Sequence, residues 1–214
     1  MEYRPFGQTG LQVSAMGFGC WEMGGTYGKI DEAQLQQAVQ RAIDAGINCF
    51  DTAEAYGMGP PEQALARALG ERRKDVSIVT KFGVGYAEAP NRRDSSRQRV
   101  MASIEKSLRN LQTDYVDVYL VHWPDVNTPF EETIRALDDI VQQGKARYIG
   151  VSNFRLEQLE TCMRVRRVSG PTRSLLQSAT LSPARSWTER AATRWSVGSC
   201  RPQTRSQPMP YRSA

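Results

Sequence analysis

The chain has 214 residues, of which 40% are hydrophobic and 24% charged, and its mean hydropathy is −0.53. This size and composition predict one soluble globular domain, and the lack of any apolar run near about 18 residues excludes a membrane-spanning helix. The net charge of +5 resides in the C-terminal tail, since residues 1–164 hold 19 Lys and Arg against 22 Asp and Glu, whereas residues 165–214 hold 9 Arg and 1 Glu.

The predicted elements begin with a β-hairpin, in which residues 3–6 and 11–13 flank the turn sequence at residues 8–10. Five pairs of a short apolar run and a segment of helical periodicity follow it. The predicted strands lie at residues 16–21, 47–52, 76–81, 116–122 and 147–152. The predicted helices begin near residues 31, 61, 94, 128 and 155.

Two of these helices carry clear start signals. Asp31 and Gln34 resemble a capping box at the first helix. At the fourth helix, Thr128 is the predicted cap, Pro129 occupies the first turn and Glu131 completes the box.

Strands that alternate with helices require a parallel sheet with helical crossovers, so the predicted fold class is α/β. The pattern stops near residue 165, beyond which Ser, Thr, Pro and Arg dominate and branched aliphatic residues are scarce. Such a segment buries too little apolar surface to offset its ordering entropy. We therefore expect a folded domain at residues 1–164 and an irregular basic tail at residues 165–214. We expect this tail to be translated out of frame or, alternatively, to be a natural basic extension.

Polar side chains stand where the predicted strands end. In chain order they are Asp51, Tyr56, Lys81, His122, Ser152 and Asn153. Singly, each has a structural explanation, such as a helix cap for Asp51 or a solvated charge for Lys81. The carboxyl ends of parallel strands share one rim, so we expect these side chains to form a common site.

This set of groups suits carbonyl reduction, which adds a hydride to carbon and a proton to oxygen. Tyr56 can donate the proton, and the Lys81 ammonium is expected to lower the phenol pKa from about 10. Asp51 would keep Lys81 charged, and a neutral His122 would orient the substrate oxygen. None of these roles needs a metal.

Several stretches carry a resemblance to a known family. They are D-T-A-E-A-Y-G at residues 51–57, K-F-G at 81–83, D-Y-V-D at 114–117, L-V-H-W-P at 120–124 and G-V-S-N-F at 150–154. In this order and spacing, over roughly residues 3–164, the chain resembles the aldo-keto reductases. The resemblance implies a (β/α)8 TIM barrel and an oxidoreductase that transfers a hydride from NADPH to an aldehyde or ketone.

The same resemblance implies roles for individual residues. Tyr56 would be the general acid, with Lys81 and Asp51 tuning it and His122 orienting the carbonyl. Ser152 and Asn153 would bind the carboxamide of the nicotinamide, and the backbone at Cys20 and Trp21 would lie beside the cofactor. The partner is then a small carbonyl compound, and neither its identity nor the oligomeric state follows from the sequence.

A complete barrel of this type has eight βα units in about 250 residues, whereas the pattern here provides five. We therefore expect a truncated or frameshifted chain that lacks the units gripping the adenosine phosphates. The expected catalytic residues are retained while part of the cofactor grip is lost, so an inactive chain stands as the alternative to a working reductase.

Two other functions stay open. The first is a non-catalytic, cofactor-binding or regulatory subunit on the same scaffold, as in channel-associated relatives. The second is a flavodoxin-like nucleotide-binding domain, although Glu22 interrupts the glycines after the first strand.

Other classes are disfavoured. The N-terminus shows no signal-peptide pattern, which predicts a cytoplasmic protein. The chain has four cysteines without a C-x-x-C pair, so we expect neither a disulfide framework nor a thiolate metal site. It has a single histidine, so we expect no metal site that needs two imidazoles. Asp114 and Asp117 flank a strand start and are expected to form a solvated strand edge. The tail has too few aromatic residues for base stacking, so we expect no nucleic-acid partner.

Overall fold

The computed structural model describes residues 1–25, 28, 31–56, 61–85 and 92–169, with side chains to residue 166. The chain begins with an antiparallel hairpin of β1 (Tyr3–Pro5) and β2 (Gln12–Ser14), which confirms the predicted hairpin. Most of the expected tail, residues 170–214, lies outside the described residues.

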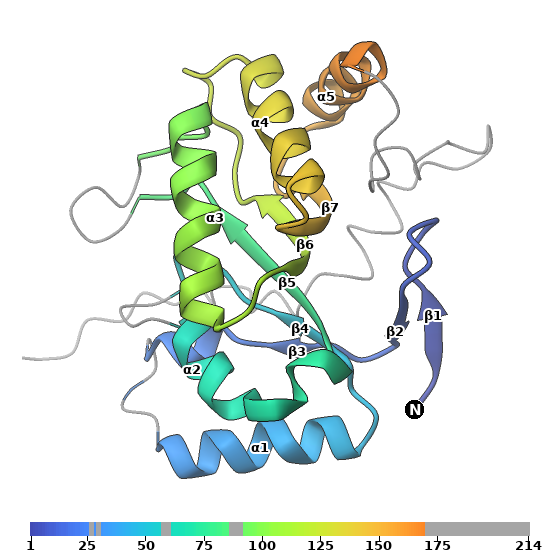
Figure 1. Ribbon diagram of the computed structural model, residues 1–214, viewed down its shortest axis with the longest axis vertical. Coiled ribbons are helices and arrows are strands. Elements are labelled where there is room, and N and C mark those ends of the chain that lie inside the picture. The colour runs from blue at the N-terminus through green and yellow to red at the C-terminus, as the bar shows by residue number, and fades with distance from the viewer. Residues whose placement is uncertain (26–27, 29–30, 57–60, 86–91, 170–214) are drawn as a thin grey trace, which may run out of the picture. The chain divides into compact units, whose positions relative to one another are not determined.

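A five-stranded parallel sheet forms the centre of the domain (Figure 1). Its strands are β3 (Phe18–Gly19), β4 (Cys49–Asp51), β5 (Ser77–Phe82), β6 (Val116–Val121) and β7 (Ala146–Val151). They pair in chain order, so each strand neighbours the strand before it. A flavodoxin-like sheet would place its second strand outside the first, so this order excludes that alternative.

The helices follow the strands in the same sequence. They are α1 (Glu32–Asp44), α2 (Pro61–Leu69), α3 (Arg97–Leu111), α4 (Phe130–Gln142) and α5 (Leu156–Ser169), with short 3-10 helices at Trp21–Gly24 and Gly70–Asp75. Each α-helix packs against the next along the sheet (Figure 1). Strands in sequential order with one layer of helices make a partial TIM barrel of five βα units, as expected. No helix in the described segments is both long and apolar enough to cross a membrane.

The main core lies between the strands and the helical layer. Side chains alternate across a strand, so Ile78, Thr80 and Phe82 of β5 face the same way and are fully buried. Thr80 donates a hydrogen bond to Glu62 of α2, which identifies this face as the helical one. Lys81 therefore points to the opposite face, which is the interior of the barrel.

One predicted helix start is correct and another is wrong. The Asp31 carboxylate accepts a 2.9 Å hydrogen bond from the Gln34 N–H, as the capping box requires. At α4 the cap position is Pro129, and no side chain caps it. The Thr128 hydroxyl instead donates to Asp125 at 2.6 Å. Because the Asp125 carboxylate is buried, it depends on protein hydrogen-bond donors.

Helix α5 continues through Ser169, beyond the boundary expected at residue 164. The Arg166 guanidinium donates to the Asp138 carboxylate of α4 at 3.1 Å, and both side chains are buried. An arginine assigned to the basic tail is therefore part of the packed domain. The composition of the segment around Arg166 indicates a tail, but the carboxylate partner of Arg166 lies 28 positions away in sequence.

Asp117 is a second buried charge, at the start of β6. It accepts hydrogen bonds from Arg73 at 3.1 Å, Arg147 at 2.9 Å and the Ile78 N–H at 2.9 Å. Its exposed fraction is 1%, so the expectation of a solvated strand edge is wrong for this residue. The carboxylate joins three segments at the amino end of the sheet, opposite the rim where the site residues lie.

We expect Asp117→Asn to lower the free energy of unfolding by about 3 kcal/mol, because the partly buried Arg73 would lose its counter-charge. Denaturant unfolding would measure the change. The matched substitution Asp114→Asn, at an exposed position of the same segment, should change stability by no more than about 0.5 kcal/mol. Equal effects of the two substitutions would show that the buried ion pairs do not stabilise the sheet.

Candidate active site

Backbone hydrogen bonds extend the sheet beyond its formal strand ends and align the expected site residues. The Cys20 N–H donates to the Asp51 carbonyl at 2.8 Å, and the His122 N–H donates to the Phe82 carbonyl at 2.9 Å. The Ser152 N–H donates to the Val121 carbonyl at 2.8 Å. The expected residues therefore lie along one rim of the sheet, as the parallel arrangement requires.

The Lys81 ammonium forms the centre of the cluster. It donates to the Asp51 carboxylate, to the Thr52 carbonyl at 3.0 Å and to the Tyr56 hydroxyl at 2.6 Å. These contacts use all three ammonium protons. The side chains of Asp51 and Tyr56, from one stretch of the sequence, and of Lys81, from another, thus form one connected group.

Burial decides the ionisation of this group. Burial lowers the pKa of Lys81, and the negative charge of Asp51 opposes that change. Burial raises the pKa of Tyr56 above its ordinary value, and the Asp51 charge raises it further. The Tyr56 pKa is therefore raised overall, opposite to the expected lowering, and desolvation is the largest cause. The phenol accordingly keeps its proton at neutral pH.

His122 stands beside the phenol. The His122 and Tyr56 rings meet edge to face with centroids 5.6 Å apart. Burial lowers the pKa of His122 from 6.5 to about 4, and the positive charges of Lys81 and Arg93 contribute. Its Nδ1 is buried and has no hydrogen-bond partner among the described residues. The imidazole is therefore neutral at physiological pH, as a substrate-orienting histidine should be.

Because the chain has one histidine, its titration is directly observable. We expect the imidazole proton resonance in the NMR spectrum to titrate near pH 4 in the folded protein, against 6.5 for the unfolded chain. The unfolded chain then binds more protons between these values, so the free energy of unfolding should fall as the pH drops from 6.5 to 4. His122→Gln should remove this component of the pH dependence. A folded-state titration near 6.5 would contradict the buried, neutral imidazole.

The two residues expected beside a cofactor differ in their surroundings. The Trp21 side chain is 44% exposed, and its ring centroid lies 4.9 Å from that of Tyr56. Cys20 is fully buried within the hydrophobic core. Cys20 therefore exposes no surface to a bound molecule in this structure, whereas Trp21 offers an open aromatic face at the rim.

Ser152 and Asn153 lie at the end of β7. The Asn153 amide donates to the His122 carbonyl at 2.8 Å and to the Ser152 hydroxyl at 3.1 Å. Its backbone adopts φ +63°, a left-handed conformation that is uncommon outside glycine and that Asn tolerates best. These contacts connect the pair to His122, while in the described part of the chain neither Tyr56 nor Lys81 forms a hydrogen bond with Ser152 or Asn153.

Glu54 is a buried residue that the expected set did not include. Its carboxylate accepts a hydrogen bond from the Gly83 N–H at 3.1 Å and pairs with Arg99 at 2.7 Å. Its backbone N–H donates to the Lys81 carbonyl at 3.0 Å. Glu54 thus connects the loop of Tyr56 to the strand end of Lys81. A charged residue between two alanines in an apolar stretch was the signal that could have identified it.

The cluster combines a protonated phenol, an ammonium that donates to the phenol oxygen, a carboxylate that holds the ammonium, and a neutral imidazole. Such a set can deliver a proton and stabilise the resulting phenolate. In the described part of the chain, no three His, Cys, Asp or Glu side chains gather in a way that could hold a metal ion.

Comparison with known proteins places these features in a family. The model of the aldo/keto reductase family matches residues 15–180. Aldo-keto reductase YhdN of Bacillus subtilis is 41% identical over 164 residues, which are 75% of this chain and 50% of that protein. A probable voltage-gated potassium channel subunit beta of Oryza sativa is 38% identical over 162 residues, which are 74% and 48% of the two chains.

Solved structures give the same result. The holo form of aldo-keto reductase AKR11C1 from Bacillus halodurans superposes with a TM-score of 0.68 at 34% identity, covering 77% of this chain and 54% of that one. Glycerol dehydrogenase AKR11B4 from Gluconobacter oxydans gives 0.67 at 34% identity, with coverages of 76% and 51%. The chain thus spans about half the length of these relatives.

Proposed function

The chain belongs to the aldo/keto reductase family, and from that premise we propose that it reduces an aldehyde or ketone with a hydride from NADPH. The observation that carries the proposal is the Lys81 ammonium, which bridges Asp51 and the Tyr56 hydroxyl beside a neutral His122. Because the chain covers only about half the length of its relatives, their activity is not taken over for this chain, and the full reaction is our proposal.

In this reaction the carbonyl carbon gains a hydride and the carbonyl oxygen gains the Tyr56 proton, which yields an alcohol and a phenolate. Lys81 stabilises the phenolate through the hydrogen bond it already donates. Asp51 holds Lys81 in its charged form against the effect of burial. His122, being neutral, hydrogen-bonds the substrate oxygen and orients it.

The residues at the rim suit a nicotinamide. A carboxamide needs both hydrogen-bond donors and acceptors, and the Ser152 hydroxyl and the Asn153 amide provide both. Ser152 and Asn153 would hold the carboxamide, with Trp21 alongside. When bound, the reduced nicotinamide supplies the hydride. The preference for NADPH over NADH is part of the proposal and is tested by comparing the two.

A second candidate is a cofactor-binding regulatory subunit that does not turn over substrate. The similarity to probable potassium channel beta subunits of Oryza sativa and Arabidopsis thaliana favours it. This candidate predicts cofactor binding without alcohol formation.

The test uses the full 214-residue chain. Binding of NADPH and NADH is titrated by fluorescence, and aldehyde-dependent loss of NADPH absorbance is then measured with benzaldehyde. The proposal expects binding and aldehyde-dependent oxidation. Binding without oxidation supports the regulatory subunit, and the absence of both rejects each candidate for this chain.

A further inference from the structure

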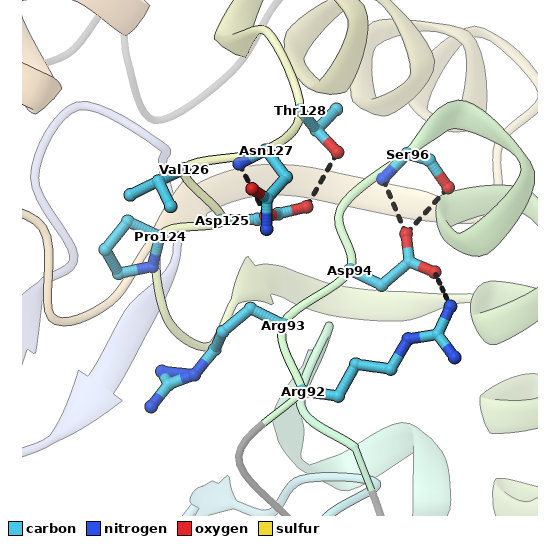
Figure 2. Close-up of a pocket in the computed structure, with 9 residues that line it drawn as sticks. All are labelled: Arg92, Arg93, Asp94, Ser96, Pro124, Asp125, Val126, Asn127 and Thr128. Carbon is cyan, nitrogen blue, oxygen red and sulfur yellow. Dashed lines mark hydrogen bonds and ion pairs between the residues drawn. The ribbon is translucent and has the colours of Figure 1, made fainter. Parts of the chain in front are cut away.

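A pocket of about 570 Å³ lies between two loops that follow strands β5 and β6 (Figure 2). Two loops line it, the segment that leads from β5 into α3 and the segment that follows His122. Its lining residues are Arg92, Arg93, Asp94, Ser96 and residues 124–128. The pocket therefore starts two residues after His122, at the same rim as the Tyr56 hydroxyl.

The acidic side chains of this pocket are already engaged. Asp125 accepts hydrogen bonds from the Ser95 N–H at 3.0 Å, the Asn127 N–H at 2.9 Å and the Thr128 hydroxyl at 2.6 Å. Figure 2 shows the Asp125 carboxylate directed toward Asn127 and Thr128. Asp125 thus fixes the two loops to each other and has little capacity left for a ligand.

Asp94 is engaged as well. It accepts from the Ser96 N–H at 3.1 Å and the Ser96 hydroxyl at 2.7 Å, and it lies 3.9 Å from the exposed Arg92 guanidinium. The Arg93 side chain extends away from both carboxylates (Figure 2). The two neighbouring arginines therefore differ, since Arg92 has a counter-charge and Arg93 has none among the described residues.

Arg93 lies over Trp123, with its guanidinium carbon 4.6 Å from the ring centroid. Its Nε is buried and has no hydrogen-bond partner among the described residues. A guanidinium held over an aromatic ring by a cation–π contact can still direct N–H donors to a carboxylate in a bidentate pair. Trp123 directly follows His122 in the chain, so the Arg93 contact lies on the residue next to the imidazole expected to orient the substrate.

The backbone holds Arg93 in place before any ligand arrives. Arg93 forms an antiparallel bridge with Val84. The Gly85 N–H donates to the Arg92 carbonyl at 2.7 Å, and the Asp94 N–H donates to the Gly83 carbonyl at 3.1 Å. These bonds anchor Arg93 to the segment that directly follows Lys81. A cation held in this way loses little conformational entropy when it binds an anion.

We propose that Arg93, supported by Trp123, binds an anionic group of the substrate, so that the preferred substrates are aldehydes or ketones carrying a carboxylate. The proposal rests on the reductase function for its substrate class. The carboxylate pairs with Arg93 while the carbonyl oxygen meets Tyr56 and His122.

The test compares 4-formylbenzoate with its neutral methyl ester, methyl 4-formylbenzoate, on the full chain. Binding is measured by isothermal titration calorimetry with NADP⁺, which cannot transfer a hydride to the aldehyde, and turnover is measured separately by NADPH oxidation. We expect the carboxylate to bind at least about tenfold more tightly than the ester, and Arg93→Gln to abolish the difference. Arg92→Gln removes the same charge from the adjacent, ion-paired position and should change the preference by no more than about twofold.

Thermal unfolding of each variant separates a local loss from a folding defect, and Arg93→Lys, which keeps the charge but not the fork, should retain part of the preference. Equal binding of the two ligands by the wild type would overturn the proposal. So would an equal loss in the Arg92 and Arg93 variants, which would indicate general electrostatics. Arg93-dependent binding without turnover would reject the reductase and leave the anion site standing.

Discussion

Replacement of Tyr56 by phenylalanine is expected to lower kcat for aldehyde reduction by about 10²- to 10⁴-fold, the usual contribution of a general acid. The ring would still contact Trp21 and His122, so KM should change little. What is lost is the one proton that the alkoxide receives and the oxygen to which Lys81 donates. Steady-state kinetics with NADPH and benzaldehyde would measure both parameters.

The matched control is Tyr115→Phe, which removes a hydroxyl from a ring that lies under Arg73, away from the rim. It should leave kcat within about twofold of the wild type, as surface substitutions usually do. Retention of wild-type kcat by Tyr56→Phe would exclude this phenol as the proton donor, whereas cofactor binding without turnover by either protein would favour the regulatory subunit.

The second large effect is expected for Lys81→Met, which should lower the activity without lowering the stability. Loss of the ammonium removes the donor that stabilises the phenolate, so kcat should fall by about 10²-fold or more. Lys81 is buried at a cost, as the lowering of its pKa by burial indicates. Methionine fills much of the same volume without that cost, and Asp51 is exposed enough to stay hydrated.

The thermal midpoint of Lys81→Met should therefore equal or exceed that of the wild type. Lys74→Met, at an exposed position of the turn before β5, controls for loss of a positive charge and should change neither quantity appreciably. A Lys81→Met protein that is much less stable, with activity lost only in proportion to folded protein, would make Lys81 a structural residue.

Much of the fold could be predicted because its signals are local. Helix α2 begins at Pro61, where the sequence places its start, and Asp31 caps α1 through its own neighbour Gln34. The errors arise where a distant group competes. Thr128 has the sequence of a helix cap, but the buried Asp125 takes its hydroxyl.

The sequence also failed to predict the environment of two charged residues, because their partners are distant in sequence. Arg166 reads as part of a basic tail and Asp117 as part of a solvated edge, yet each is buried in an ion pair with a residue far away in sequence. Charge patterning along the chain describes the average environment of a segment. It contains no information about a single buried pair.

The candidate site also combines features that the sequence predicts with features that depend on residues distant in sequence. Parallel strands bring their carboxyl ends together, which is why Asp51, Tyr56 and Lys81 could be predicted to meet. The direction of the Tyr56 pKa could not, because it depends on burial by the surrounding structure. Arg93 could not either, since its position over Trp123 comes from two loops that join different strands and helices.

The most direct test of the proposed chemistry is isotope transfer by the full chain. NADPH carrying deuterium at its hydride-donating carbon is mixed with benzaldehyde in a single turnover, and the alcohol is analysed by mass spectrometry. The wild type should yield benzyl alcohol labelled at the former carbonyl carbon, and Tyr56→Phe should form it far more slowly. Absence of labelled alcohol from the wild type, or equal rates for both proteins, would contradict a phenol-driven carbonyl reduction at this site.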